Sequence, residues 1–133
     1  MSTMPEMVLQ LIALQDALGG NYAELSRPKL RLMVKLEQGP VNISELAERL
    51  RISSPAVSQM IDKLSSDGYV RRASLAGDQR VVAAALTDVG REVLARALIA
   101  FRDRVQEVLA PLTPEEFSRL AEVLEKALGA PQE

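Results

Sequence analysis

The hydrophobic pattern at the start of the chain is that of a helix with one apolar face. The apolar residues recur at intervals of three and four, which is the spacing of a helical face: Met4, Met7, Leu11, Leu14 and Leu18. Gly19-Gly20 follows directly. Because glycine is common just beyond the last turn of a helix, we expect the helix to end there.

A second helix is predicted to begin near Ser26 or Arg27. It is expected to stop before Gly39-Pro40, because the residue before a proline disfavours the helical conformation. Its inner face is predicted to hold four apolar residues: Leu30, Met33, Val34 and Leu36. Residues 41–43 are then expected to form a short extended segment.

Two further helices around a tight turn are predicted between residues 44 and 68. Ser44 is expected to cap the first of them, and Ser54 with Pro55 to begin the second. Gly68 is the expected stop. On a helical wheel the second helix places its apolar residues on one side: Val57, Met60, Ile61 and Leu64.

A β-hairpin is predicted directly after this pair. Residues 69–74 and 81–86 are rich in β-forming residues, and residues 75–80 form the expected loop, whose tip is Gly77-Asp78-Gln79-Arg80. The order predicts a mainly α fold with a small β-hairpin wing, that is, a winged helix-turn-helix with additional helices at both ends. This arrangement is typical of proteins that bind duplex DNA.

The last third of the chain is predicted to form two more helices. Thr87 can cap the first, and Pro111 ends it; Thr113 with Glu116 forms a capping box for the second. Apolar residues again follow helical spacing: Leu94, Leu98, Phe101, Val105 and Val108, then Phe117, Leu120, Val123, Leu124 and Leu128. These apolar stripes either pack within the chain or bury themselves in a dimer.

The composition excludes several kinds of chemistry. The 133 residues include no Cys and no His, which removes disulfides, thiol nucleophiles and the usual zinc sites, so we expect no metal, no cofactor and no enzymatic activity. The longest apolar run is residues 81–86, too short to span a bilayer, and the first twenty residues lack the positive n-region of a signal peptide, so we expect a protein that is neither secreted nor membrane-spanning. A cytoplasmic location is therefore expected.

The net charge of −2 is unevenly distributed. Residues 1–26 carry −3, residues 27–86 carry +4 and residues 87–133 carry −3. Positive charge therefore coincides with the predicted winged helix-turn-helix, where a phosphate backbone would be met. The alternative is chance scatter of surface charge.

Candidate DNA-binding residues lie on the polar side of the second helix of the pair and on the wing. Six are expected at the major groove: Ser53, Ser54, Pro55, Ser58, Gln59 and Lys63. Arg71, Arg72 and Arg80 are the wing candidates, with Arg80 suited to a minor groove and Asp78 expected to hold Arg80 or another arginine in position. The alternatives are an ordinary solvated helix face and a surface ion pair in a turn.

These segments resemble the MarR-type winged-helix transcription regulators. The resemblance rests on residues 41–47, on the Ser-Ser-Pro-Ala-Val-Ser start of the second helix, on residues 67–72, and on Asp78-Gln79-Arg80 followed by Leu86-Thr87 and Gly90. It implies a homodimer with interlocking terminal helices. Many relatives have Arg in place of Gln79 and a basic residue in place of Ala73, so this wing is less basic than usual.

The resemblance and the apolar stripes together predict three regions: an N-terminal dimerisation helix in residues 1–26, the DNA-binding region in residues 27–90, and C-terminal dimerisation helices in residues 91–133, all within one compact domain. The predicted dimerisation residues are Met7, Leu11, Leu14, Leu98, Phe101, Val105, Phe117, Leu120 and Leu124.

The predicted function is a sequence-specific, dimeric DNA-binding regulator. The resemblance implies that it is a repressor responsive to a small ligand. Its expected partners are double-stranded DNA with a pseudo-palindromic site, a second copy of the chain, and a small-molecule effector of unknown identity, with no membrane. The alternative is a winged-helix protein-interaction module that does not bind DNA, which the acidic total charge favours.

Overall fold

The computed structural model describes residues 1–75 and 78–129, and for residues 75 and 78–81 it describes the backbone alone. The chain divides into two compact units. One comprises residues 20–100, and the other comprises residues 1–19 together with residues 101–133. Each unit is described by itself below.

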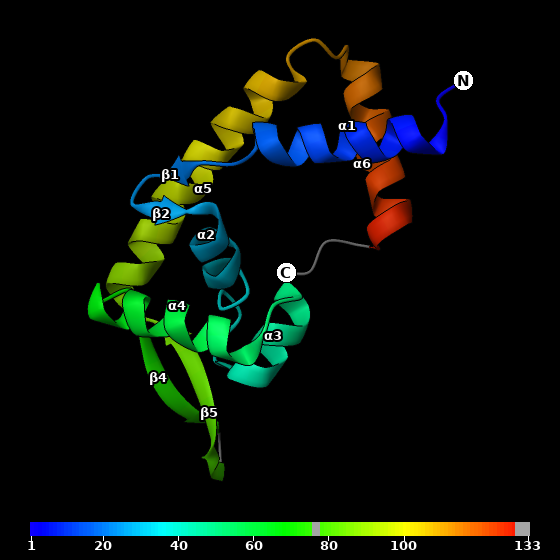
Figure 1. The fold of residues 1–133 in the computed structure, drawn as a ribbon. Coiled ribbons are helices and arrows are strands. Elements are labelled where there is room, and N and C mark those ends of the chain that lie inside the picture. Colours follow the sequence, from blue (N-terminus) through cyan, green and yellow to red (C-terminus); the bar gives the residue numbers. More distant parts are fainter. Residues whose placement is uncertain (76–77, 130–133) are drawn as a thin grey trace. The chain divides into compact units, whose positions relative to one another are not determined.

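The described residues of the unit 20–100 form two small sheets, three helices and the first half of a fourth (Figure 1). Its elements, in chain order, are β1 (Asn21–Tyr22), β2 (Leu25–Ser26), α2 (Arg27–Val34), β3 (Val41–Asn42), α3 (Ile43–Leu50), α4 (Ser54–Ser66), β4 (Val70–Leu75), β5 (Asp78–Leu86) and α5 (Asp88–Leu109). The winged helix-turn-helix order is confirmed. The hairpin of β1 and β2 is an addition that the hydrophobic pattern did not indicate.

The core of this unit is formed by buried apolar side chains of its helices and strands. Its largest fully buried side chains are Leu25, Leu32, Met33, Leu36, Leu46, Val57, Ile61 and Leu64. The predicted inner face of α2 was partly wrong, because Leu32 is fully buried whereas Val34 is only half-buried. The reason is that α2 contacts β1, β2 and α3, so more than one side of this helix is covered.

The helix pair begins one or two residues earlier than predicted. The cap of α3 is Asn42, whose Oδ1 accepts a hydrogen bond from the Glu45 N–H at 2.6 Å, so the prediction of Ser44 was wrong. The cap of α4 is Ser53, whose Oγ accepts from the Ala56 N–H at 3.2 Å, and Ser54 is already helical. Asn and Ser are both favoured at helix N-caps. The observed caps, Asn42 and Ser53, are the residues whose backbone is still extended.

The wing is longer than predicted. Strand β5 already begins at Asp78, so three residues placed in the loop belong to the strand. The three-stranded antiparallel sheet has the order β3-β5-β4, with Val41 opposite Ala84 and Val70 opposite Leu86. The register between β4 and β5 shifts between Ser74 and Leu75, and the two strands stay paired as far as Leu75 and Asp78.

The base of the wing is held tightly against the start of α5. The Thr87 hydroxyl donates to the Gly68 carbonyl at 2.6 Å and accepts from the Gly90 N–H at 2.9 Å, while the Thr87 N–H donates to the Tyr69 carbonyl. Gly90 lies so close that a Cβ there would be 1.9 Å from the Tyr69 carbonyl oxygen. This contact fixes the end of α4 relative to the first turn of α5.

We predict that Gly90→Ala destabilises the protein by about 3 kcal/mol, because its methyl group would displace backbone atoms. Thermal or urea unfolding measures the change. The control is Ala95→Gly on the exposed side of the same helix, which should cost only about 1 kcal/mol through helix propensity. Equal losses for the two variants would contradict the close contact.

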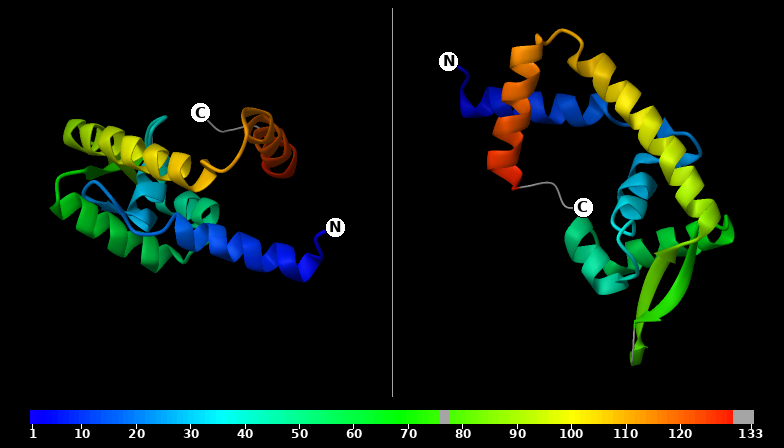
Figure 2. Two further views of the ribbon diagram at one scale, coloured as in Figure 1. Left: turned by 90° about the horizontal axis from the view of Figure 1, so that it is seen from above. Right: turned by 180° about the vertical axis from the view of Figure 1, so that it is seen from behind.

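The other unit comprises α1 (Met4–Ala17), the end of α5 and α6 (Pro114–Leu128). Capping boxes begin both terminal helices, at Thr3 with Glu6 and at Thr113 with Glu116. Helices α1 and α6 overlap in one view of Figure 2 and lie apart in the other, and neither helix has a buried residue. Among the described residues, no helix is both long and apolar enough to cross a membrane.

Candidate nucleic-acid interface

Helix α4 has one buried face and one exposed polar face. Val57, Ile61 and Leu64 are buried in the core and hold the helix in place. The residues predicted to contact DNA lie away from that core: Ser53, Ser54, Pro55, Gln59 and Lys63 are exposed, and Ser58 is half-buried. The structure therefore brings all six together on and beside one helix.

This exposed face offers groups that can read base edges. The Gln59 side chain has both a donor and an acceptor, the pair that an adenine edge matches in the major groove. Ser54 and Ser58 add hydroxyls that donate or accept. The Ser53 hydroxyl oxygen is already an acceptor for the Ala56 N–H, so its first role is to cap α4.

Two of the predicted DNA-binding cations are paired with carboxylates. Lys63 Nζ lies 3.4 Å from Asp67 Oδ1, one helical turn away, and Arg72 Nη2 lies 2.6 Å from Asp62 Oδ1. Arg71 is exposed and forms no ion pair with any described side chain. The sequence did not indicate that Asp62 pairs with Arg72, because these two residues, ten positions apart, meet only once the wing folds beside α4.

The wing-tip predictions fall outside the described side chains. Asp78, Gln79 and Arg80 are placed as backbone in β5, so the role of Arg80 at a minor groove and of Asp78 as its support stay predictions. Ala73 is half-buried and faces Ala83 across the sheet. Because residue 73 is alanine, this position of β4 carries no positive charge.

The predicted dimerisation residues are all exposed or half-buried. Met7, Leu11, Leu14, Phe117 and Leu124 are exposed, and Leu98, Phe101, Val105 and Leu120 are half-buried. The exposed fraction of Phe117 reaches 52%. Contiguous exposed apolar patches are typical of surfaces that bind another surface, and the role of these residues in a dimer stays a prediction.

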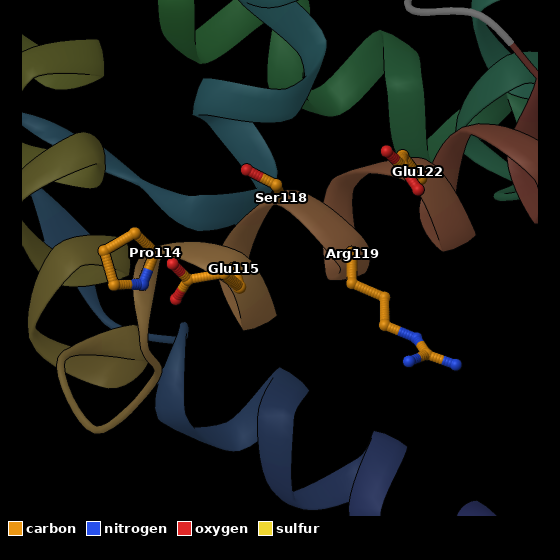
Figure 3. A pocket seen from close by; sticks show the side chains of 5 residues that line it. All are labelled: Pro114, Glu115, Ser118, Arg119 and Glu122. Atoms are coloured by element: carbon orange, nitrogen blue, oxygen red, sulfur yellow. The ribbon is translucent and has the colours of Figure 1, made fainter.

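Shallow depressions lie on the described part of the unit that contains α6. One is lined by five residues of α6 alone (Figure 3): Pro114, Glu115, Ser118, Arg119 and Glu122. Because all five belong to one helix, this depression is a surface groove and not an enclosed cavity. Another is mainly apolar and lies between the end of α5 and α6, lined by Leu109, Leu112, Glu116, Arg119, Leu120 and Val123.

The described residues contain no group of three or more acidic side chains that could hold a metal ion. The arrangement of α3, α4 and the β4–β5 hairpin instead defines a winged helix-turn-helix protein. Residues 25–82 match the MarR family.

Three relatives are named as helix-turn-helix transcriptional regulators. TcaR of Staphylococcus aureus is 31% identical over 107 residues, 79% of this chain and 71% of TcaR. YkoM of Bacillus subtilis is 33% identical over 90 residues, 68% of this chain and 58% of YkoM. MdtR of Bacillus subtilis, a transcriptional repressor, is 30% identical over 94 residues, 71% of this chain and 61% of MdtR. The match thus spans about six-tenths of the length of two of these relatives. Together with the family match, these relatives show that the chain belongs to the MarR family.

Solved structures share the fold over almost the whole chain. BldR of Sulfolobus solfataricus has a TM-score of 0.76 at 25% identity, covering 96% of this chain and 98% of BldR. A variant of MarR from E. coli, complexed with operator DNA, has a TM-score of 0.76 at 23% identity, covering 94% of each chain.

We predict that Gln59→Ala changes which base is preferred at one position of the DNA site, because a bidentate contact discriminates by about 1–3 kcal/mol. Selection from a random duplex pool compares the two preferred sequences. Glu48→Ala on α3 is the control, and it should leave the preference unchanged. Identical preferences for wild type and Gln59→Ala would show that Gln59 does not read a base.

Proposed function

We propose that this protein is a DNA-binding transcription regulator whose helix α4 enters the major groove while the wing contacts the adjoining backbone or minor groove. The observation that carries the proposal is the division of α4. Val57, Ile61 and Leu64 on its apolar side are fully buried, so its polar side with Gln59 and Lys63 is held outwards. In a MarR-family chain with a net charge of +4 in residues 27–86, duplex DNA is the partner that fits this surface.

The regulator acts as a homodimer in this proposal. The apolar side chains of α1, such as Leu11, are exposed over the whole helix, and the apolar groove between α5 and α6 offers a surface of the same kind. A second copy would remove both from water, at about 25 cal/mol for each Å² of apolar surface buried. Two-fold symmetry would then present two α4 helices to a pseudo-palindromic site.

Repression is the proposed direction of regulation. The support is that MdtR is named a repressor, and that a MarR variant has been solved on operator DNA. A dimer on an operator can block transcription by occupancy alone. A cytoplasmic location is proposed because that is where a regulator of this kind meets DNA.

The first test is titration of a random-sequence duplex of about 30 base pairs by fluorescence anisotropy, at 50 and 200 mM salt. We expect binding that weakens as salt rises, because each phosphate contact contributes about 0.9 to the slope of log K against log salt. Lack of salt-sensitive binding at 50 mM would contradict DNA binding and favour the alternative, a protein-interaction module.

The second test addresses the dimer. We expect Leu11→Glu to raise the dimer dissociation constant by about 100-fold or more, because both copies lose a buried leucine. Sedimentation equilibrium measures it. Ala13→Glu adds the same charge on the side of α1 opposite Leu11 and should change the constant little. Equal effects would place the interface elsewhere.

A further inference from the structure

An ion pair joins the two elements that are proposed to contact DNA. Arg72 of β4 and Asp62 of α4 approach to 2.6 Å between Nη2 and Oδ1, which is a charge-assisted hydrogen bond. Asp62 lies on the same exposed side of α4 as Gln59 and Lys63. The pair therefore spans from the recognition helix to the wing.

This ion pair adds little to the stability of the fold. The two side chains are 42% and 68% exposed, for Arg72 and Asp62 respectively. Pairs this exposed contribute about 0–1 kcal/mol, since water screens both charges. Strand β4 is already held by its pairing with β5, and the base of the wing is held by Thr87. The main effect of the ion pair is therefore on the charge of the surface where it lies.

At that surface the pair changes how much positive charge is available to phosphates. An arginine whose guanidinium is bound to a carboxylate is a weaker phosphate ligand than a free one, because the carboxylate competes for the same donors. Neighbouring Arg71 has no described ion partner and provides the comparison within the same strand. Two adjacent arginines thus differ in availability.

We propose that Asp62 is a positioning residue that holds Arg72 against α4 and withholds it from the DNA backbone. Asp62 acts as an internal competitor of phosphate, so that it lowers general affinity for duplex DNA and leaves a larger share of binding to base contacts such as that of Gln59. This inference rests on the proposed function. It assigns to Arg72 a role different from the direct DNA contact that the sequence predicted.

The test is a double-mutant cycle of Asp62→Asn, Arg72→Gln and the combined variant. Each protein is titrated with the same random-sequence duplex of about 30 base pairs between 50 and 200 mM salt. We expect Asp62→Asn to bind more tightly than wild type and to steepen the salt slope by about 0.9, one additional phosphate contact. Its advantage should therefore shrink by about 3.5-fold between the two salt concentrations.

Arg72→Gln separates the inference from a simple effect of charge. When Asp62 is present, Arg72→Gln should reduce the salt slope only slightly. When Asp62 is replaced by Asn and Arg72 is free, Arg72→Gln should reduce the salt slope more than twice as much. Arg71→Gln removes the same charge from the next residue and should reduce the slope equally in both backgrounds. Circular dichroism confirms that each variant is folded.

Two outcomes overturn the inference in different ways. If Arg72→Gln reduces the slope equally in both backgrounds, Arg72 is a direct phosphate ligand in the complex, and the inference is wrong while DNA binding stands. If the wild-type protein shows no salt-sensitive binding at all, the proposed function fails and the inference fails with it.

Discussion

The burial of one side of α4 is the constraint on which the rest of the account depends. Val57, Ile61 and Leu64 are completely removed from water, and together they stabilise the helix in its place by several kcal/mol. Because the buried side fixes the rotation of α4 about its axis, it also fixes the direction in which the opposite side faces. The polar residues of α4 are exposed for this reason, and they need no further structure to present them. At the end of α4, the close contact of Gly90 with the Tyr69 carbonyl holds the wing beside the helix.

Electrostatics then determine how this surface would meet a phosphate backbone. Residues 27–86 carry more bases than acids, yet Arg72 and Lys63 are each paired with a carboxylate of α4 or its end. A surface in which cations are partly neutralised relies less on general attraction to DNA and more on contacts with bases. The low basicity of this wing, with Ala73 in β4, acts in the same direction.

The fold could be predicted from the sequence wherever a local pattern determines the structure. The helical spacing of Val57, Ile61 and Leu64 and the capping box of Thr113 depend only on neighbouring residues, and both are confirmed. The cap at Asn42 was missed because several good capping residues follow one another, and pairing of β3 with β5 decides where the chain leaves the extended conformation. The burial of Leu32 was missed because it depends on elements packed around α2.

The candidate site shows the same division. That Pro55, Gln59 and Lys63 lie on the exposed side of α4 follows from helical geometry, whereas the pairing of Asp62 with Arg72 depends on the distance between a helix and a strand after folding. The most direct test of the central claim is hydrogen exchange of the protein with and without the duplex selected from a random pool. The account predicts slower exchange in residues 53–63 and in β4, because bound DNA covers them. Protection confined to α1 and α6, with α4 unchanged, would contradict it.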